Sequence, residues 1–415
     1  MRENLTGNLL IAQSGGPTAV INSSISGVIV EAKRHHEVQG IYGAVNGILG
    51  VLSEDLVDLR QEDELTISKL RRTPSAALGS CRYKLNEGDY ARIVDVLGAH
   101  KISYLVFAGG NDSMDTAHTI ANLTADKKNG LRVMGVPKTV DNDLPMTDHC
   151  PGYGSVARFN SIAVRDAGLD NEAICTSDTV KIVETMGRDT GWITASTALG
   201  KSGDGSAPHL IYLPERPFVA GKFLEDVKAV YDKFNRVVIC VCEGLRDEKG
   251  EFVKASSKQI DTDNFGHIQL GGVGDYLVNL VSTSLGIKAR CDKPGTIQRV
   301  SMTCASQIDL DEAYSVGQLA VSKAVEGESD KMVALQRKSN EPYECEITLV
   351  NLEQVALKTR KVPDEFIDKN SNYVSDRFIA YARPLIGGPL PEYASLKRRL
   401  VEKLLPDRAV SRPQR

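Results

Sequence analysis

The stretch from Leu9 to Lys33 reads LLIAQSGGPTAVINSSISGVIVEAK and contains the pattern that decides the fold. Its apolar start, Leu9–Ala12, predicts a buried strand, and an amphipathic stretch from about Ala19 predicts a helix. Gly15 and Gly16 lie in the turn between them. Paired glycines allow backbone N–H groups to close around an anion at the N-terminus of a helix. A tight turn without a ligand explains the same pair, so this turn alone leaves both interpretations open.

The strand, turn and helix pattern recurs along the chain. Apolar runs that end in glycine or polar turns occur at Tyr104–Ala108, Leu131–Val136 and Val237–Cys242. Strands that alternate with helices predict an α/β fold with doubly wound, mostly parallel sheets. Ligands of such folds bind beyond the carboxyl ends of the strands, so we expect functional residues in the turns that follow the strands.

The composition of the 415 residues is that of an ordinary globular protein, with 41% hydrophobic and 25% charged residues. This length predicts two to three domains. The eight cysteines form no CxxC pair, as expected for free thiols in a reducing compartment. A net charge of −4 without a basic block argues against a nucleic-acid partner. Because we find neither a signal-peptide pattern nor a membrane-spanning apolar run, we expect a cytoplasmic protein without a membrane partner.

The turn after the second apolar run is Gly109-Gly110-Asn111-Asp112-Ser113. The Asp112 carboxylate beside the glycines suits a magnesium ion that carries phosphate oxygens. For this turn alone, capping of the next helix by Asp112 or Ser113 is the simpler interpretation.

The segment PKTVDND at 137–143 carries the strongest functional signal. In an extended chain Thr139, Asp141 and Asp143 share one side, and Lys138 points to the other. Two carboxylates and a lysine provide a base, a metal ligand and a phosphate clamp within one turn. A solvated polar loop is the alternative interpretation. Prolines near both ends stiffen the segment, which favours the functional interpretation.

Arginines also stand next to glycine or in compact motifs, at Arg82, Arg188, Arg290 and Arg299. Planar guanidinium groups match phosphate oxygens, but the spacing alone does not show that the four converge. The seven histidines have no metal-ligand spacing, and we assign them no role.

Taken in order, these motifs resemble those of the phosphofructokinase family. The matching motifs are GG at 15–16, LGSxR at 78–82, GGxDS at 109–113, PKTxDND at 137–143, MGR at 186–188, EG at 243–244 and GxIQR at 295–299. The resemblance extends from about Leu9 to at least Gly317. It implies two similar doubly wound, mostly parallel-sheet domains with the active site in the cleft between them.

The resemblance also implies how the chain is divided. Residues 1–154 with about 300–350 would form the domain that binds the phosphoryl donor. Residues from about 155–299 with 351–415 would form the sugar-phosphate domain, including a C-terminal extension.

The implied activity is reversible, Mg²⁺-dependent phosphoryl transfer to the 1-hydroxyl of fructose 6-phosphate. Asp141 would be the catalytic base, helped by Lys138 and Arg188. The implied substrate ligands are Thr139, Asp141, Asp143, Met186, Gly187, Arg188, Glu243, Arg290, Thr296 and Arg299. The implied donor ligands are Gly15, Gly16, Arg82, Gly110, Asp112, Ser113 and Lys138, with Asp112 as the metal ligand.

Two positions depart from the family pattern, and a third implies a neighbouring subunit. Thr296 stands where many relatives carry histidine, and Asn111 stands where most carry the first aspartate of GGD. Arg290 would reach across from a neighbouring subunit, so the resemblance implies a homodimer or homotetramer.

The identity of the donor depends on Asp112 and Lys138, where ATP-using relatives tend to have glycine. Asp112 would crowd and repel an α-phosphate, and Lys138 offers a cation to a terminal phosphate. We therefore expect pyrophosphate as the donor and phosphate and fructose 1,6-bisphosphate as the products. An ATP-dependent 6-phosphofructokinase and a non-catalytic regulatory subunit of the family are the alternatives.

Overall fold

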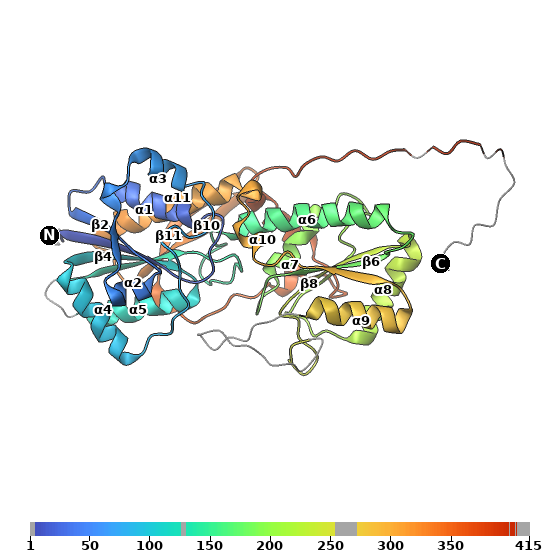
Figure 1. The fold of residues 1–415 in the computed structure, drawn as a ribbon, viewed down its shortest axis with the longest axis horizontal. Coiled ribbons are helices and arrows are strands. Elements are labelled where there is room, and N and C mark those ends of the chain that lie inside the picture. Colours follow the sequence, from blue (N-terminus) through green and yellow to red (C-terminus); the bar gives the residue numbers. More distant parts are fainter. Residues whose placement is uncertain (1–4, 126–129, 254–271, 398, 403, 405–415) are drawn as a thin grey trace.

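The structure is a computed structural model that describes residues 5–125, 130–253, 272–397, 399–402 and 404. The chain forms two lobes, each built around its own sheet (Figure 1). Within these described ranges, none of the helices is both long and apolar enough to cross a membrane.

The first lobe contains a seven-stranded sheet in the order β11-β10-β5-β4-β1-β2-β3. The strands are β1 (Gly7–Gln13), β2 (Val38–Ala44), β3 (Leu56–Asp58), β4 (Ile102–Gly109), β5 (Arg132–Pro137), β10 (Lys331–Asn340) and β11 (Tyr343–Asn351). The strands from β2 to β10 pair in parallel, whereas β3 and β11 are antiparallel edges. The strands predicted at 9–12, 104–108 and 131–136 coincide with β1, β4 and β5 to within a few residues.

Both faces of this sheet are covered by helices, which explains why its central strands β1, β4 and β5 are almost entirely buried. Along β1, Leu9 and Ile11 point into one core, and Leu10 and Ala12 point into the other. The first core is closed by α1 (Ile21–Ala32), α3 (Glu64–Leu70) and α11 (Gln307–Val325). The second core is closed by α2 (Ile48–Ser53), α4 (Glu87–Ala99) and α5 (Asn111–Thr124) (Figure 1).

The second lobe contains a four-stranded, fully parallel sheet in the order β7-β8-β6-β9. Its strands are β6 (Val180–Thr185), β7 (Leu210–Tyr212), β8 (Val237–Cys242) and β9 (Ala289–Asp292). One face packs on α6 (Tyr153–Ala173), α7 (Trp192–Ser196) and α12 (Asp376–Ala382). The other face packs on α8 (Ala220–Phe234) and α9 (Val273–Leu285). The predicted α/β class with mostly parallel sheets is confirmed, although the two sheets differ in size.

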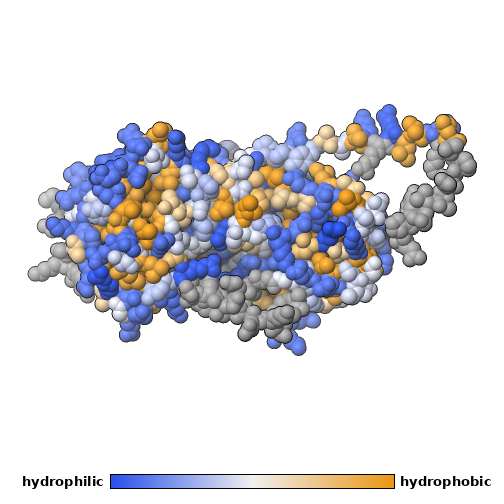
Figure 2. Space-filling model, in the orientation of Figure 1, coloured by the Kyte–Doolittle hydropathy of each residue, from blue (hydrophilic) through white to orange (hydrophobic). Residues whose placement is uncertain are grey.

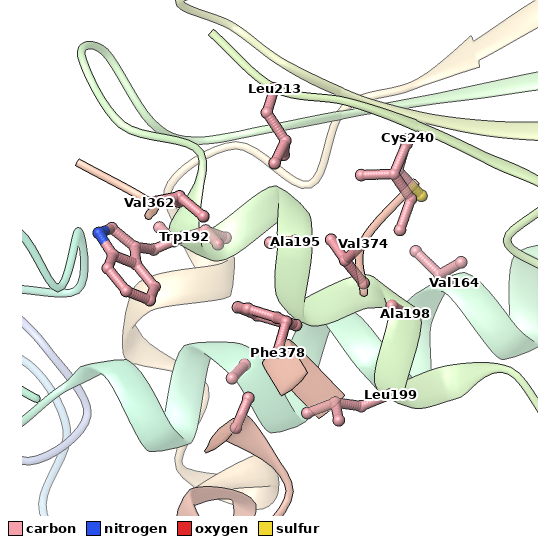
Figure 3. Packing of buried hydrophobic residues seen from close by; sticks show 14 of the residues in the cluster. Val164, Trp192, Ala195, Ala198, Leu199, Leu213, Cys240, Val362, Val374 and Phe378 are labelled. Atoms are coloured by element: carbon pink, nitrogen blue, oxygen red, sulfur yellow. The ribbon is translucent and has the colours of Figure 1, made fainter. Parts of the chain in front are cut away.

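The buried core between the second sheet and α6 includes residues from far along the chain. Figure 3 shows Trp192 and Ala195 of α7 close to Phe378 of α12, with Cys240 of β8 above them. Trp192 and Phe378 have ring centroids 6.4 Å apart. The segment after β11 therefore completes the core of the second lobe.

The chain passes between the lobes three times: before α6, before α11 and after β11. Short helices α10 (Ile297–Val300) and η4 (Leu352–Gln354) lie near two of these crossings. The domain boundaries at 154, 300 and 350 stay predictions. The end of the predicted C-terminal extension, 405–415, lies outside the described residues.

Candidate active site

A cavity of about 410 Å³ lies between the two lobes. Most of its wall consists of turns that follow strands. Its lining is Ser14, Gly15, Gly16, Arg82, Gly110, Asn111, Asp112, Ser113, Lys138, Thr139, Val140, Asp141, Asp143, Met186, Arg188, Asp189, Thr190, Glu243, Arg299, Leu357 and Thr359.

The cavity lies where the folding rule for parallel sheets predicts it. The carboxyl ends of β1, β4 and β5 provide the first-lobe wall, and those of β6 and β8 provide Met186, Arg188 and Glu243. Of the seventeen predicted site residues, fourteen line this one cavity. Their individual roles stay predictions.

Two cationic side chains lie against the backbone of the glycine pair. A Cβ at Gly15, where φ is +80°, would lie 3.0 Å from Nζ of Lys138. A Cβ at Gly16 would lie 2.6 Å from a guanidinium nitrogen of Arg299. The turn is therefore a close approach between backbone and side chains, and the positive φ of Gly15 favours glycine there.

Lys138 is almost fully buried, with 3% of its surface exposed. Its Nζ donates a hydrogen bond to the carbonyl of Gly16 at 2.9 Å. Burial, together with the positive charges of Arg299 and Arg82, lowers the pKa of Lys138 to about 8. An anion bound beside Lys138 would therefore stabilise the charged form of this lysine.

Burial also disfavours the charged form of the carboxyl groups in this segment, and it shifts their pKa values upward. Burial raises the pKa of Asp141, and Arg188 and Lys138 oppose that shift. Burial and the neighbouring Asp141 raise the pKa of Asp143 to about 7. Across the cavity, burial also raises the pKa of Glu243 to about 7. Asp143 and Glu243 are therefore poised to exchange protons near neutral pH.

Arg299 shows most directly that the cavity suits an anion. Its Nε is buried and has no hydrogen-bond partner among the residues that the structure describes. Burial and the charge of Arg82 lower the pKa of Arg299. A buried guanidinium N–H without an acceptor is costly, and phosphate oxygens are acceptors of matching geometry.

Three predicted residues do not line the cavity. Gly187 lies behind it, with φ of +137°, and its N–H donates to Glu243 Oε1 at 3.1 Å. A Cβ there would lie 2.6 Å from the carbonyl oxygen of Thr190, so Gly187 lets the turn pack. Thr296 is the residue before α10 and likewise lies outside the lining.

Arg290 lies elsewhere in this chain. It pairs in register with Lys181 near the start of β6, whereas the cavity lies at the opposite end of that strand. Its Nε forms an ion pair of 2.7 Å with Asp178. Any contact of Arg290 with a sugar phosphate would therefore be to another subunit, and this stays a prediction.

Several lining residues had no role in the sequence prediction. Asp189 and Thr190 directly follow the MGR motif, so an extension of that motif by two residues would have found them. Leu357 and Thr359 come from the segment after β11, where no motif marks them. Asn111 also lines the cavity, and its amide contacts this same segment.

Carboxylates that could share a cation lie on the first-lobe wall. Asp112, Asp141 and Asp143 line the same cavity. In the part of the chain that the structure describes, no group of three or more His, Cys, Asp or Glu side chains is arranged to hold a metal. Mg²⁺ is commonly bound by one or two carboxylates together with phosphate oxygens of a substrate, so this donor set fits it.

The fold, the order of the motifs and the cleft define the class of the protein. The family model described as phosphofructokinase matches residues 8–299, and the chain belongs to the phosphofructokinase family.

Relatives within the family can be named more closely. The chain is 41% identical over 404 residues to a protein of Rhodospirillum rubrum named pyrophosphate–fructose 6-phosphate 1-phosphotransferase, covering 96% of this chain and 99% of that one. A Halomonas elongata protein of the same name is 40% identical over 415 residues, covering 96% and 98%. The solved structure of a pyrophosphate-dependent phosphofructokinase from Marinobacter aquaeolei superposes with a TM-score of 0.84 at 38% identity, covering 96% and 98%.

Proposed function

We propose that this protein transfers a phosphoryl group reversibly between pyrophosphate and the 1-hydroxyl of fructose 6-phosphate. The buried ammonium group of Lys138 carries the proposal. A compact anion such as pyrophosphate would stabilise a cation this deeply buried. The names of relatives at about 40% identity support the same donor.

The residues of the cavity account for the steps of this transfer. The 1-oxygen of the sugar bonds to the nearer phosphorus, the bond from that phosphorus to the bridging oxygen breaks, and phosphate leaves. Asp141 accepts the proton of the 1-hydroxyl. Lys138 offsets the negative charge on the donor and leaving phosphate, while Arg188 balances charge near Asp141. Arg299 holds the 6-phosphate through its buried guanidinium.

We also propose Mg²⁺ as the cofactor, with Asp112 as its ligand from the chain. When bound, Mg²⁺ neutralises charge on the donor phosphates. The residues of the chain then orient the two substrates, and Asp141 holds the proton. A cytoplasmic location and a homodimer or homotetramer, with Arg290 facing a neighbouring subunit, complete the proposal.

One assay tests the donor: purified chain, fructose 6-phosphate and Mg²⁺, with either pyrophosphate or ATP. We expect fructose 1,6-bisphosphate with pyrophosphate and little with ATP. Product with ATP only would make the donor assignment wrong. No product with either donor would favour a regulatory subunit.

A double variant tests the residues behind the donor assignment. Lys138→Gly with Asp112→Gly should lower kcat/KM for pyrophosphate by at least about 100-fold, because it removes the buried cation and the metal ligand. The same variant creates space for a nucleotide, so ATP turnover is measured alongside. Lys233→Gly with Asp204→Gly, which removes an exposed ion pair of 2.7 Å, is the matched control. Full pyrophosphate activity in the first variant would contradict the assignment.

A further inference from the structure

The segment Val355–Arg360, which we name the strap, crosses the rim of the cavity on its way from β11 to the second lobe. Val355 anchors its start, since its side chain is fully buried in the first-lobe core. Leu357 and Thr359 then line the cavity. Leu357 is a large apolar side chain that is nevertheless 68% exposed.

The far end of the strap is fixed to the catalytic segment and to the second lobe. The N–H of Arg360 donates to the carbonyl of Asp143 at 2.6 Å, and its Nη2 donates to the carbonyl of Asn142 at 2.8 Å. Nε1 of Trp192 donates to the carbonyl of Arg360 at 3.0 Å. The Arg360 guanidinium also stacks 4.6 Å above the Trp192 ring. The strap is therefore held at both ends by buried groups.

Its middle is tied to the donor end of the cavity. Asn111, the first residue of α5, donates from its side-chain amide to the carbonyl of Lys358 at 3.3 Å and to Oγ1 of Thr359 at 3.4 Å. Asn111 directly precedes Asp112, the predicted metal ligand. The strap thus lies against the turn that is predicted to bind the donor, on the side of the second lobe.

The backbone at Leu357 is held in an uncommon conformation. Its φ of +55° lies in the left-handed region, which costs a non-glycine residue about 1 kcal/mol or more. Such conformations persist where the surroundings impose them. The chain is anchored on both sides of Leu357, at Val355 and Arg360, and Leu357 itself lines the cavity.

We propose that the strap limits the length of the phosphoryl donor. Leu357 and Thr359 close the donor end, so that pyrophosphate fits and a third phosphate would lie against the strap. A charged phosphate placed against Leu357 would contact an apolar side chain that offers no hydrogen-bond donor. The inference rests on the proposed function, and it adds a determinant of donor choice that is separate from Lys138 and Asp112.

The size of the cavity supports a short donor. Its volume of about 410 Å³ lies toward the lower end of the roughly 300–1,000 Å³ found for ligand sites. This space has to accept a sugar phosphate and a phosphoryl donor together. Selection against a longer donor by a fixed obstacle is a common way of achieving specificity.

The test compares donors of different length. Wild type, Leu357→Gly with Thr359→Gly, and Leu396→Ala are assayed with fructose 6-phosphate, Mg²⁺ and either pyrophosphate or tripolyphosphate. The strap variant should raise the ratio of kcat/KM for tripolyphosphate to that for pyrophosphate by about tenfold or more. Leu396 is 87% exposed in the C-terminal segment, far from the lining residues in sequence, and its variant should leave the ratio unchanged.

Glycine is chosen at 357 because it accepts the positive φ without strain, so the variant should fold. Leu357→Ala removes the same side chain but keeps the strain, and its ratio should rise in the same direction. An unchanged ratio in both variants would overturn the proposal.

Calorimetry of imidodiphosphate and tripolyphosphate binding separates this inference from the proposed function. If wild type turns over pyrophosphate and tripolyphosphate equally well, the strap proposal is wrong and the proposed function stands. If wild type is inactive with pyrophosphate but its strap variant alone gains tripolyphosphate affinity, the strap proposal stands and the proposed function is wrong. If wild type uses ATP and not pyrophosphate, both are wrong.

Discussion

Lys138 and Asp141 belong to one short segment, and burial shifts their pKa values in opposite directions. Burial lowers the pKa of Lys138 to about 8 and raises that of Asp141. Each shift weakens the charged form, and each residue is also the other's electrostatic partner. Each of the two charges therefore depends on the other. We expect the effect of a single substitution on activity to depend more on the charge that it changes than on the shape of the side chain.

The first prediction at this scale concerns the base. Asp141→Asn should lower kcat by about 10²–10⁴-fold, because an amide cannot accept the proton of the sugar hydroxyl. Steady-state kinetics with both substrates measure this, and thermal unfolding should show that the fold is kept. Asp204→Asn, at an exposed ion pair with Lys233, is the control. A loss below tenfold in Asp141→Asn would rule out its role as the base.

The second prediction concerns the lysine and pH. Lys138 is protonated below its pKa of about 8 and loses its charge above it. Since kcat/KM reports the free enzyme, kcat/KM for pyrophosphate should fall as pH rises above about 8. Lys138→Arg keeps its charge at these pH values and should flatten this limb of the profile, whatever its absolute activity. An unchanged limb in the arginine variant would assign the ionisation to another group.

At the scale of elements, the close packing of two helices requires small residues where their backbones meet. Helices α1 and α11 lie next to each other on one face of the first sheet (Figure 1). A Cβ at Gly27 of α1 would lie 2.1 Å from the carbonyl oxygen of Tyr314, and one at Gly317 of α11 would lie 2.2 Å from that of Ser24. The two backbones therefore approach each other through a reciprocal pair of glycines.

Gly27→Ala should consequently lower the free energy of unfolding by about 1–3 kcal/mol or more, because backbone has to move to admit the methyl group. Gly98→Ala in α4 is the matched control, since its Cβ would meet nothing within 4 Å. There alanine should stabilise the helix by about 0.5–1 kcal/mol. Urea unfolding measures both, and a neutral Gly27→Ala would contradict the close approach.

The elements also show what the sequence could predict. The strand from Val237 to Cys242 was predicted with its observed bounds, because a buried parallel strand is apolar throughout and ends at a polar turn. The cavity lining from β1, β4, β5, β6 and β8 follows from the same local rule. Leu357 and Thr359 could not be predicted, because the strap reaches the cavity only through the crossing between lobes. Motif position alone also could not place Arg290 at the opposite end of the second sheet.

The whole molecule is elongated, with the two lobes side by side (Figure 1). The C-terminal segment after residue 388 first packs on α6, where Arg158 donates to the carbonyl of Pro389 and Tyr393 donates to Asp166. Figure 2 shows hydrophobic side chains on that segment. Leu396 and Leu400, which belong to it, are almost fully exposed. The lobes are joined near the cavity by a buried polar network around His149, a residue to which the sequence assigned no role. One partner, Asp148, is its neighbour in sequence, but the other, Glu312, is 163 residues away, so no local pattern could have indicated the complete network.

His149 lies between two acidic partners that belong to different parts of the first lobe. Its Nδ1 lies 2.8 Å from Asp148 Oδ2, and its Nε2 lies 2.6 Å from Glu312 Oε2 of α11. Asp148 is also held by Arg337 at 2.8 Å, and its carbonyl accepts a hydrogen bond from Tyr381 of the second lobe. Burial alone would lower the pKa of His149, but Glu312 and Asp148 raise it to about 9.

This network predicts that the stability of the protein falls at alkaline pH. Because the folded pKa of His149 lies above its unfolded value of about 6.5, the stabilisation is fully present below pH 6.5 and is lost as pH rises through 9. Between pH 6 and pH 9 the free energy of unfolding should fall by about 2–3 kcal/mol from this residue. Urea unfolding of wild type and His149→Gln at both pH values isolates that contribution, because other titrating groups, Lys138 included, are common to both proteins. An equal pH dependence in the two proteins would show that His149 is neutral when folded. The lobes would then be joined by hydrogen bonds alone, without a buried charge that responds to pH.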